Sequence, residues 1–405
     1  FMLILHIATI GLLFALARRL QIGSLAAGLG VLAFALSPLV VEFSRYVLLD
    51  NVALPWLLGA FILALSPRRS LAAAIGSATC MAIAILSKET FAVLLPVLLY
   101  ALWRNGDARN RRYVLTAFGV VFLMISAAYI LYAALKNELL PGDGHVSLIG
   151  TLLWQLFGRE GSGSIFDAAS GTRGLVSYWL QIDYWLLAAG TVALIPALIY
   201  RNLRPAGLAL LISLALLLRS GYLPYPYVII ILPFAALALA GTIDRLMIRP
   251  LMRGKTTARL GAGALILTIL LTAVIFVAPA WQAKLTALTS IDQDQSSRQA
   301  VAWIDANIAR DSRLVVESAL WTDLQVSGFS QPDPVWLYKT ETDPEVTREL
   351  AGWQGIDYIV LNGPTIGARG FAQAFPTVSE AIQNGTVIQE FGSDNQKILV
   401  YKISK

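Results

Sequence analysis

The chain has 405 residues, of which 57% are hydrophobic and only 14% are charged. A soluble core needs less apolar side chain than this, so the composition excludes an ordinary soluble protein and favours a membrane protein. Residues 1–281 hold 21 Lys and Arg against 10 Asp and Glu, whereas the remaining residues hold 10 against 15. A positive excess beside apolar segments is typical of membrane proteins, and we expect no nucleic-acid partner.

Apolar runs long enough to be membrane helices recur along the first 281 residues. A helix needs about 17 to 25 mostly apolar residues to cross a bilayer, and the runs predict about ten such helices. They lie near residues 1–17, 23–41, 51–66, 70–86, 90–103, 113–135, 185–200, 205–218, 226–244 and 260–281. Several are short, so their boundaries are predicted only to within a few residues.

The loops between these runs differ in charge. Alternate loops place most arginines on one side, among them Arg18, Arg104 and Arg249, and the positive-inside rule makes that side cytoplasmic. The tail after Gln282 is then outside, as is the long loop of residues 136–184. We interpret Gly161 and Gly163 of this loop as flexible positions, because no strand and helix flank them as in a phosphate loop.

From Ser296 the pattern changes to that of a soluble α/β domain. Strands are predicted at residues 314–317, 358–361, 387–391 and 398–403, with helices at 297–308, 344–353 and 377–383. The fold class is thus a polytopic α-helical membrane protein with a C-terminal α/β domain. We expect residues 1–284 to form the transmembrane domain and residues 285–405 to lie outside the plasma membrane.

Charged residues gather where the predicted spans meet the outer interface. Charges near membrane spans are costly and often mark a functional site. A transporter would place them near the midplane, whereas an outer-interface site suits a polar head group with a lipid tail, such as a lipid-linked sugar phosphate. The residues concerned are Glu42, Arg45, Asp50, Lys88, Glu89 and Arg219.

Short motifs in the same regions resemble a known family. Phe43-Ser-Arg-Tyr-Val-Leu-Leu-Asp-Asn51, Ile85-Leu-Ser-Lys-Glu-Thr90 and Tyr225-Pro-Tyr-Val-Ile-Ile-Ile-Leu-Pro233 are similar, in this order, to motifs of the GT-C glycosyltransferases, in their protein-mannosyltransferase and aminoarabinose-transferase-like branch. Gln299-Ala-Val-Ala-Trp-Ile-Asp305 and Asp357-Tyr-Ile-Val-Leu361 resemble the tail of bacterial members. The resemblance implies inverting transfer of a sugar, hexose or pentose, from a polyprenyl phosphate to an acceptor at the outer face.

The resemblance also assigns roles to the charged residues. The family's principal catalytic acid lies in a loop after its first span, and we expect that loop upstream of Phe1, which leaves open whether the chain as given is active. Asp50 matches a second acidic position and is a candidate catalytic residue or ligand of a divalent cation such as Mg²⁺ or Mn²⁺. The alternative is a helix N-cap. Lys88 and Arg219 are candidates for binding the donor phosphate, or else basic side chains that reach lipid head groups.

The remaining candidate residues would support Asp50, Lys88 and Arg219. Arg45 and Glu89 could pair with Asp50 and Lys88, or form a surface ion-pair network. The tyrosines Tyr222, Tyr225 and Tyr227 could line the substrate groove, or belong to the interfacial aromatic belt. Three functions stay open: a glycosyltransferase, which we favour, a lipid-linked sugar transporter or flippase, and a membrane-anchored binding protein. The acceptor, whether protein, lipid or glycan, is not specified by the sequence.

Overall fold

The computed structural model describes residues 1–142, 145–159, 161–253, 256–290, 292, 294–330, 332–368, 370–393 and 396–404. The chain packs into two compact units. The first unit comprises residues 1–131 and 159–290, and the second comprises residues 132–158 and 291–405. The first is helical and the second contains the only sheet formed by the described residues.

Each apolar run that predicts a span contains a helix. The helices are α1 (Met2–Arg19), α2 (Ser24–Leu36), α3 (Pro38–Arg45), α4 (Leu49–Ala64), α5 (Leu71–Ser87), α6 (Leu95–Asn105), α7 (Arg111–Leu135), α9 (Gly171–Ile182), α10 (Tyr184–Ile199), α11 (Arg204–Ala215), α12 (Val228–Ile243), α13 (Arg249–Arg253), α14 (Thr256–Thr272) and α15 (Ala278–Ser290). Short helical turns η1 (Glu89–Leu94), η3 (Leu216–Leu218) and η4 (Tyr225–Tyr227) precede or follow them.

Several of these helices can cross a membrane by length and composition. In the described part of the chain four do so alone, namely Met2–Arg19, Arg111–Leu135, Tyr225–Met252 and Arg259–Asn307. Two bent pairs raise the number to six: α2 with α3, bent by 59°, and α9 with α10, bent by 107°. Three further helices are apolar but shorter than these candidate spans. The chain is therefore helical and membrane-embedded, while the count of about ten spans stays a prediction.

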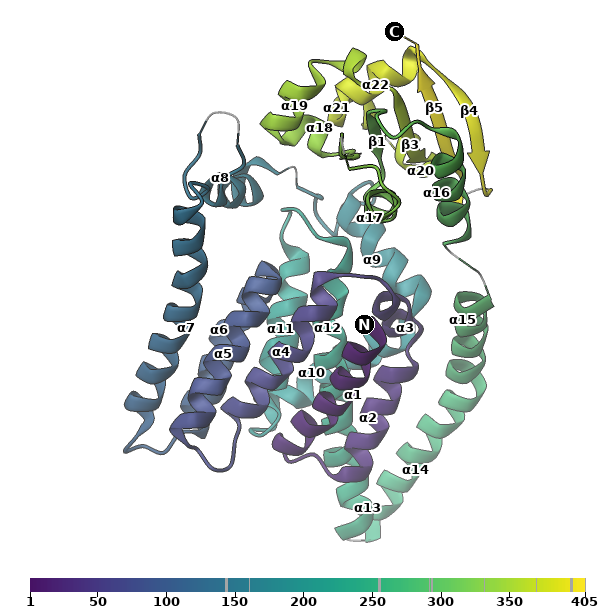
Figure 1. Cartoon of the computed structure of the whole chain (residues 1–405). Helices are drawn as coiled ribbons and strands as arrows, with labels where there is room; N and C mark the ends of the chain where they lie inside the picture. The colour runs from purple at the N-terminus through teal and green to yellow at the C-terminus, as the bar shows by residue number, and fades with distance from the viewer. Residues whose placement is uncertain are drawn as a thin grey trace. The chain divides into compact units, whose positions relative to one another are not determined.

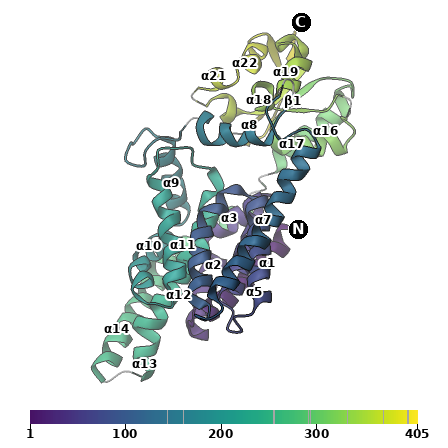
Figure 2. The same cartoon turned by 90° about the vertical axis from the view of Figure 1, so that its left-hand side faces the viewer.

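Helix α12 is the centre of the first unit. Nearly all its residues are buried, as expected of a helix that is apolar on every side. It packs against α2, α10 and α11, and Figures 1 and 2 show α10, α11 and α12 side by side. A Cβ atom at Gly30 or at Gly190 would come within 2.5 Å of an alanine Cβ on α12. Glycine at these two positions is what allows the helix axes to approach so closely.

A buried carboxylate connects the two bends. Asp183, between α9 and α10, accepts hydrogen bonds from the hydroxyl of Ser37, between α2 and α3, and from the indole Nε1 of Trp281 on α15 at 3.1 Å. The backbone N–H of Leu186 donates to the same side chain at 3.1 Å, which caps α10. Two helix junctions and α15, far apart in sequence, are thus fixed to one another by a single satisfied polar group.

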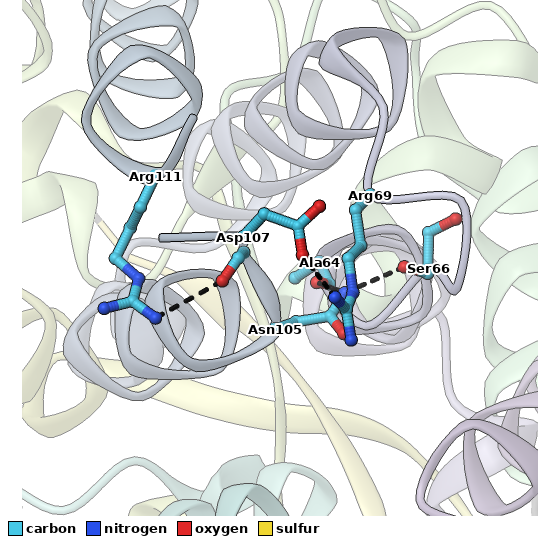
Figure 3. A network of polar contacts seen from close by, with 7 residues as sticks. Ala64, Ser66, Arg69, Asn105, Asp107 and Arg111 are labelled. Carbon is cyan, nitrogen blue, oxygen red and sulfur yellow. Dashed lines mark hydrogen bonds and ion pairs between the residues drawn. The ribbon is translucent and has the colours of Figure 1, made fainter. Parts of the chain in front are cut away.

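A second polar cluster lies where α4 ends, α5 begins and α6 ends (Figure 3). The amide of Asn105 donates to the carbonyl oxygens of Ala64 at 3.0 Å and Ser66 at 2.8 Å. Arg69 forms an ion pair with Asp107. These contacts tie the turn between α4 and α5 to the end of α6, because the last carbonyls of a helix have no partner within the helix itself.

Replacing Asn105 with Ala is expected to destabilise the folded protein by about 1 to 2 kcal/mol, since two partly buried carbonyls lose their donor. The thermal unfolding midpoint in detergent measures this change. Gln282→Ala, which truncates an exposed amide side chain inside α15, is the control and should leave the midpoint unchanged. Equal midpoints for the two variants would contradict the role given to Asn105.

The second unit contains a five-stranded sheet with strand order β2-β1-β3-β5-β4. Strands β1 (Leu314–Val316), β2 (Val335–Trp336) and β3 (Tyr358–Asn362) are parallel to one another. Strand β5 (Ile398–Ile403) pairs antiparallel with β3, and β4 (Gly385–Phe391) pairs antiparallel with β5. The helices are α8 (Leu148–Leu153), α16 (Gln295–Asn307), α17 (Ser318–Val326), α18 (Lys339–Thr342), α19 (Pro344–Leu350), α20 (Gly363–Ile366), α21 (Phe371–Ala374) and α22 (Pro376–Gln383).

Alternation along the strands divides the apolar side chains between two cores. Leu314 and Val316 face one core together with α16 and α17, whereas Val315 faces the other together with α19, α21 and α22. The four predicted strands all form. Strand β2 was missed because two residues are too few to show a period. We expect Val315, Ile359, Val360 and Leu399 to be buried on these strands; the first three are buried, whereas Leu399 is only half-buried.

Candidate functional site

Asp50 lies in the first turn of α4 and is 4% exposed. The chain is extended just before it, and the amide of Asn51 donates to the carbonyl oxygens of Phe43 at 2.8 Å and Tyr46 at 3.0 Å, which fixes the turn between α3 and α4. The N-cap residue of α4 is Leu48, whose side chain makes no cap hydrogen bond. The N-cap interpretation of Asp50 is therefore wrong. Its carboxylate lies in the first turn, where it accepts from its own backbone N–H and benefits from the helix dipole.

Lys88 lies at the same end of the bundle as Asp50. Helices α4 and α5 are consecutive, antiparallel and extensively packed, so the residue after α5 returns to the start of α4. The Lys88 ammonium attracts the Asp50 carboxylate electrostatically. Lys88 Nζ also lies 3.5 Å from a carboxylate oxygen of Glu89, which is exposed and repels Asp50. Asp50, Lys88 and Glu89 thus lie at one end of α4 and α5, and the ion pair of Glu89 with Lys88 is present. That this ion pair fixes a site stays a prediction.

Arg45 does not join this group. Its guanidinium donates instead to the carbonyl oxygen of Leu288, near the end of α15. In place of the predicted pairing of Arg45 with Asp50, the structure has a contact between α3 and α15. The carbonyls in the last turn of a helix have no intrahelical donor, and a guanidinium supplies one.

Arg219 directly follows η3 and is exposed. Its guanidinium folds over the backbone of Gly221, where an added Cβ would come 2.6 Å from Nε. Helix α11, which leads to Arg219, packs against η1 and α6, the elements that follow Lys88. The two cations thus come from neighbouring elements. We predict that Arg219, Asp50 and Lys88 converge on one outward-facing cavity.

The three candidate tyrosines have three different environments. Tyr227 is buried and its hydroxyl donates to the carbonyl oxygen of Ser213 at 3.1 Å, so it packs inside the bundle. Tyr222 lies under the guanidinium of Arg159, which is 3.3 Å from the ring centre. The Tyr225 hydroxyl donates to the hydroxyl of another tyrosine. Among the described side chains these rings do not form one continuous wall, so the shared tyrosine groove stays a prediction.

The partner of Tyr225 belongs to a cluster that sequence reasoning missed. Tyr178 on α9 accepts from Tyr225 at 3.1 Å and donates its own hydroxyl to Glu42 on α3, which is 6% exposed. The ring of Phe43 lies 5.0 Å from that of Tyr225. Glu42, as a charge between two apolar runs, and Tyr225, as a groove candidate, carried a signal in the sequence, whereas nothing marked Tyr178. The buried carboxylate and the two hydroxyls form a further polar cluster next to the α3–α4 turn.

The long loop predicted at residues 136–184 is not a simple loop. It contains α8 and α9, and the stretch around Gly161 and Gly163 is hydrogen-bonded rather than free. Ser162 accepts a hydrogen bond from the backbone N–H of Leu223 at 2.9 Å, and its own N–H donates to Gly221 at 3.3 Å. The glycines allow this close approach, since a Cβ at Gly161 would come 2.4 Å from a carbonyl oxygen.

A groove runs along α6, which begins seven residues after Lys88. It has a volume of about 600 Å³ and is almost entirely apolar. The lining comes from α6 and α7 and consists of Leu95, Leu99, Tyr100, Trp103, Leu115, Phe118, Gly119, Phe122 and Leu123. The polar pair of Asp50 and Lys88 is thus followed along the chain by an apolar channel of the kind that accommodates a hydrocarbon chain.

No group of three or more His, Cys, Asp or Glu side chains in the described residues is arranged to hold a metal ion. A Mg²⁺ ion, however, commonly uses only one or two carboxylates and completes its shell with water and substrate phosphate. The residues present fit a divalent cation only in that second way, with Asp50 as one ligand.

One family model and two solved structures resemble this chain. Residues 1–132 match the family model described as dolichyl-phosphate-mannose-protein mannosyltransferase. A crystal structure of ArnT from Cupriavidus metallidurans bound to undecaprenyl phosphate superposes with a TM-score of 0.59 at 18% identity, over 99% of this chain and 82% of that one. The chain has the fold of ArnT. The resemblance to the GT-C branch that contains the protein mannosyltransferases and ArnT is confirmed.

The apo structure of the same ArnT gives a TM-score of 0.54 at 17% identity, with the same coverage of both chains. No curated protein sequence matches the chain. The family match covers the segment that contains both Asp50 and Lys88.

Proposed function

We propose that this chain is an integral-membrane glycosyltransferase that moves a sugar from a polyprenyl phosphate to an acceptor at the outer membrane face. The observation that carries the proposal is that Asp50 and Lys88 lie at the same end of α4 and α5, and that α6, which lines the apolar groove, begins shortly after Lys88. A donor of this class has a charged phosphate and a long hydrocarbon tail. Asp50 and Lys88 supply a charged environment for the phosphate, and the groove supplies an apolar one for the tail. The ArnT neighbour is bound to undecaprenyl phosphate.

Lys88 is the residue that we assign to the donor phosphate. During transfer the bond between the sugar's anomeric carbon and the phosphate oxygen breaks, the acceptor forms a bond to that carbon, and the polyprenyl phosphate leaves with added negative charge. A cation held beside the leaving oxygen stabilises this charge. Lys88 is 21% exposed, so its charge is only partly screened by water. Arg219 is assigned to the same phosphate, from the neighbouring α11 side.

Asp50 acts on the other side of the reacting carbon in this proposal. A buried carboxylate that does not cap its helix is available to accept a hydrogen bond from the acceptor hydroxyl and to orient it. In the alternative role it is a ligand of a divalent cation that also contacts the donor phosphate. Glu89 holds Lys88 in place, and its substitution should have a smaller effect than that of either partner.

The function is tested by transfer in vesicles. The full-length gene product is reconstituted with a radiolabelled undecaprenyl-phosphate sugar and an outer-membrane or cell-envelope extract as acceptor source. Movement of label out of the solvent-extractable donor into another fraction is the expected result. Label that crosses the bilayer while still attached to the donor would favour a flippase instead. A donor with the wrong sugar would give no transfer even with an active enzyme, so hexose- and pentose-bearing donors are both used. Absence of transfer from both donors would contradict the proposal.

The assignment of the groove predicts a labelling pattern. An undecaprenyl phosphate with a diazirine on its isoprenoid chain is expected to crosslink to the α6 and α7 residues that line the groove, Leu99 and Phe118 among them. Mass spectrometry of the digested protein locates the sites. Leu99→Trp narrows the groove and should reduce labelling at Phe118, whereas a Trp in place of Leu267, an exposed apolar residue on α14, is the control. Crosslinks confined to other helices would refute the groove.

A chelator distinguishes the two roles of Asp50. If Asp50 binds a divalent cation, EDTA should abolish transfer and Mg²⁺ or Mn²⁺ should restore it. If Asp50 orients the acceptor, transfer should proceed at an unchanged rate in EDTA. The proposal of a metal ligand is lost in the second case, while the proposed transferase function is retained.

A further inference from the structure

The second unit contains a cleft that plays no part in the proposed transfer site. It has a volume of about 610 Å³, within the range of small-molecule sites, and lies along the edge strand β2. It is lined by side chains that precede β1, flank β2 and continue into α17, α18 and α19. They are Arg313, Trp321, Ser330, Pro332, Asp333, Pro334, Val335, Trp336, Lys339, Asp343, Glu345, Val346 and Glu349.

Two tryptophans form the apolar part of this cleft. The rings of Trp321 and Trp336 lie 5.5 Å apart and nearly perpendicular, at 81°. The Trp321 Nε1 donates to the carbonyl oxygen of Pro334 at 2.7 Å, which fixes that ring. The Trp336 Nε1 is buried and has no acceptor among the described residues. A rigid aromatic corner with one unused donor is unusual in a small domain, since buried indole N–H groups are normally satisfied.

Charged groups surround the tryptophans. The Lys339 ammonium lies 5.6 Å from the centre of the Trp336 ring and 3.6 Å from a carboxylate oxygen of Asp343. Arg313 pairs with Glu349 at 2.9 Å. Two further carboxylates, Asp333 and Glu345, complete the lining, so four acidic side chains face two basic ones. This balance disfavours phosphates, nucleic acids and acidic glycans, and the number of charges disfavours a purely apolar ligand.

We propose that this cleft, defined by Trp321 and Trp336, binds the ring of a neutral or amine-bearing saccharide. The C–H face of a pyranose packs on an aromatic ring, while its hydroxyls need charged or polar partners around the ring's edge. The tryptophan corner supplies the first requirement, and the carboxylates with Arg313 and Lys339 supply the second. The inference goes beyond the proposed function, because binding at this cleft requires no transfer activity from the helical unit.

Binding is measured on the full-length protein in lipid nanodiscs by saturation-transfer NMR, with titration for the dissociation constant. The probes are maltotriose, the fully deacetylated chitosan trimer and trigalacturonate. We expect binding of at least one of the first two, with the acidic trimer at least tenfold weaker. Absence of saturation transfer to both maltotriose and the chitosan trimer, or equal binding of all three probes, would overturn the proposal.

Two substitutions locate the site. Trp336→Ala removes the stacking surface and should weaken binding at least tenfold, whereas Trp303→Ala, a tryptophan of the same unit that packs on Phe391 instead, is the matched control and should not. Glu345→Gln should weaken binding about three- to tenfold, because a charged acceptor becomes neutral. Glu345 is exposed, so this variant tests the site even if Trp336→Ala fails to fold. Wild-type binding by the Glu345 variant together with either unchanged binding or misfolding of the Trp336 variant would refute the cleft.

Discussion

Replacing Lys88 with Met is expected to slow sugar transfer by about ten- to a thousandfold, equivalent to a loss of roughly 1.4 to 4 kcal/mol of transition-state stabilisation. Met keeps the apolar contacts of the lysine stem and removes only the charge. The phosphate is charged in the bound donor as well as in the transition state, so part of the loss should appear as weaker donor binding. Rates at limiting and saturating donor separate the two contributions.

The control for this variant is Lys136→Met, which removes another lysine located just after a membrane helix. If Lys88 only reaches lipid head groups, as lysines near helix ends often do, the two variants should behave alike. The yield of detergent-extracted protein reports folding, and it should change little for either one. Wild-type transfer by Lys88→Met at limiting donor would remove Lys88 from the site.

Replacing Asp50 with Asn is expected to slow transfer by about a hundred- to a thousandfold while the protein remains folded. The amide has nearly the same shape, but it accepts hydrogen bonds weakly and cannot take a proton or ligate a cation well. Folding should be retained because Asp50 does not cap α4, and because removing a buried charge lowers the cost of burial. Saturating donor should not restore the rate, since the loss concerns the chemical step rather than donor binding.

Asp183 provides the contrasting case. It is also buried, but Ser37, Leu186 and Trp281 all donate to it. Asp183→Ala leaves these donors without an acceptor, so it should lower the unfolding midpoint and the yield, with transfer per folded molecule largely unchanged. If Asp50→Asn and Asp183→Ala instead lowered yield and activity in parallel, Asp50 would be a structural residue.

Part of the site follows from the chain's local pattern. Apolar runs of sufficient length predicted a helix at each span, because in lipid only helices or closed barrels satisfy the backbone. Two consecutive membrane helices joined by a short turn must be antiparallel, and this alone returns Lys88 to the end of the bundle where Asp50 begins α4. The grouping of these two residues was therefore predictable without any tertiary information.

Contacts between distant segments were not predictable in this way. Arg45 bonds to Leu288, and Glu42 bonds to Tyr178, across separations of 243 and 136 residues. The sequence marks each charge as costly in a membrane, but it does not say which of several nearby partners satisfies it. That choice depends on how the helices are arranged around α12.

The sequence by itself determined the membrane class, the helices at the predicted spans, the longer strands of the tail and the placement of Asp50 and Lys88 at one end of two consecutive helices. Each depends on composition or on contacts between adjacent elements. Only the tertiary structure decided the bends at Ser37 and Asp183, the apolar groove between α6 and α7, and the cleft beside the short strand β2. These features arise where side chains from separate elements meet, and packing between elements is not encoded in the period of any one of them.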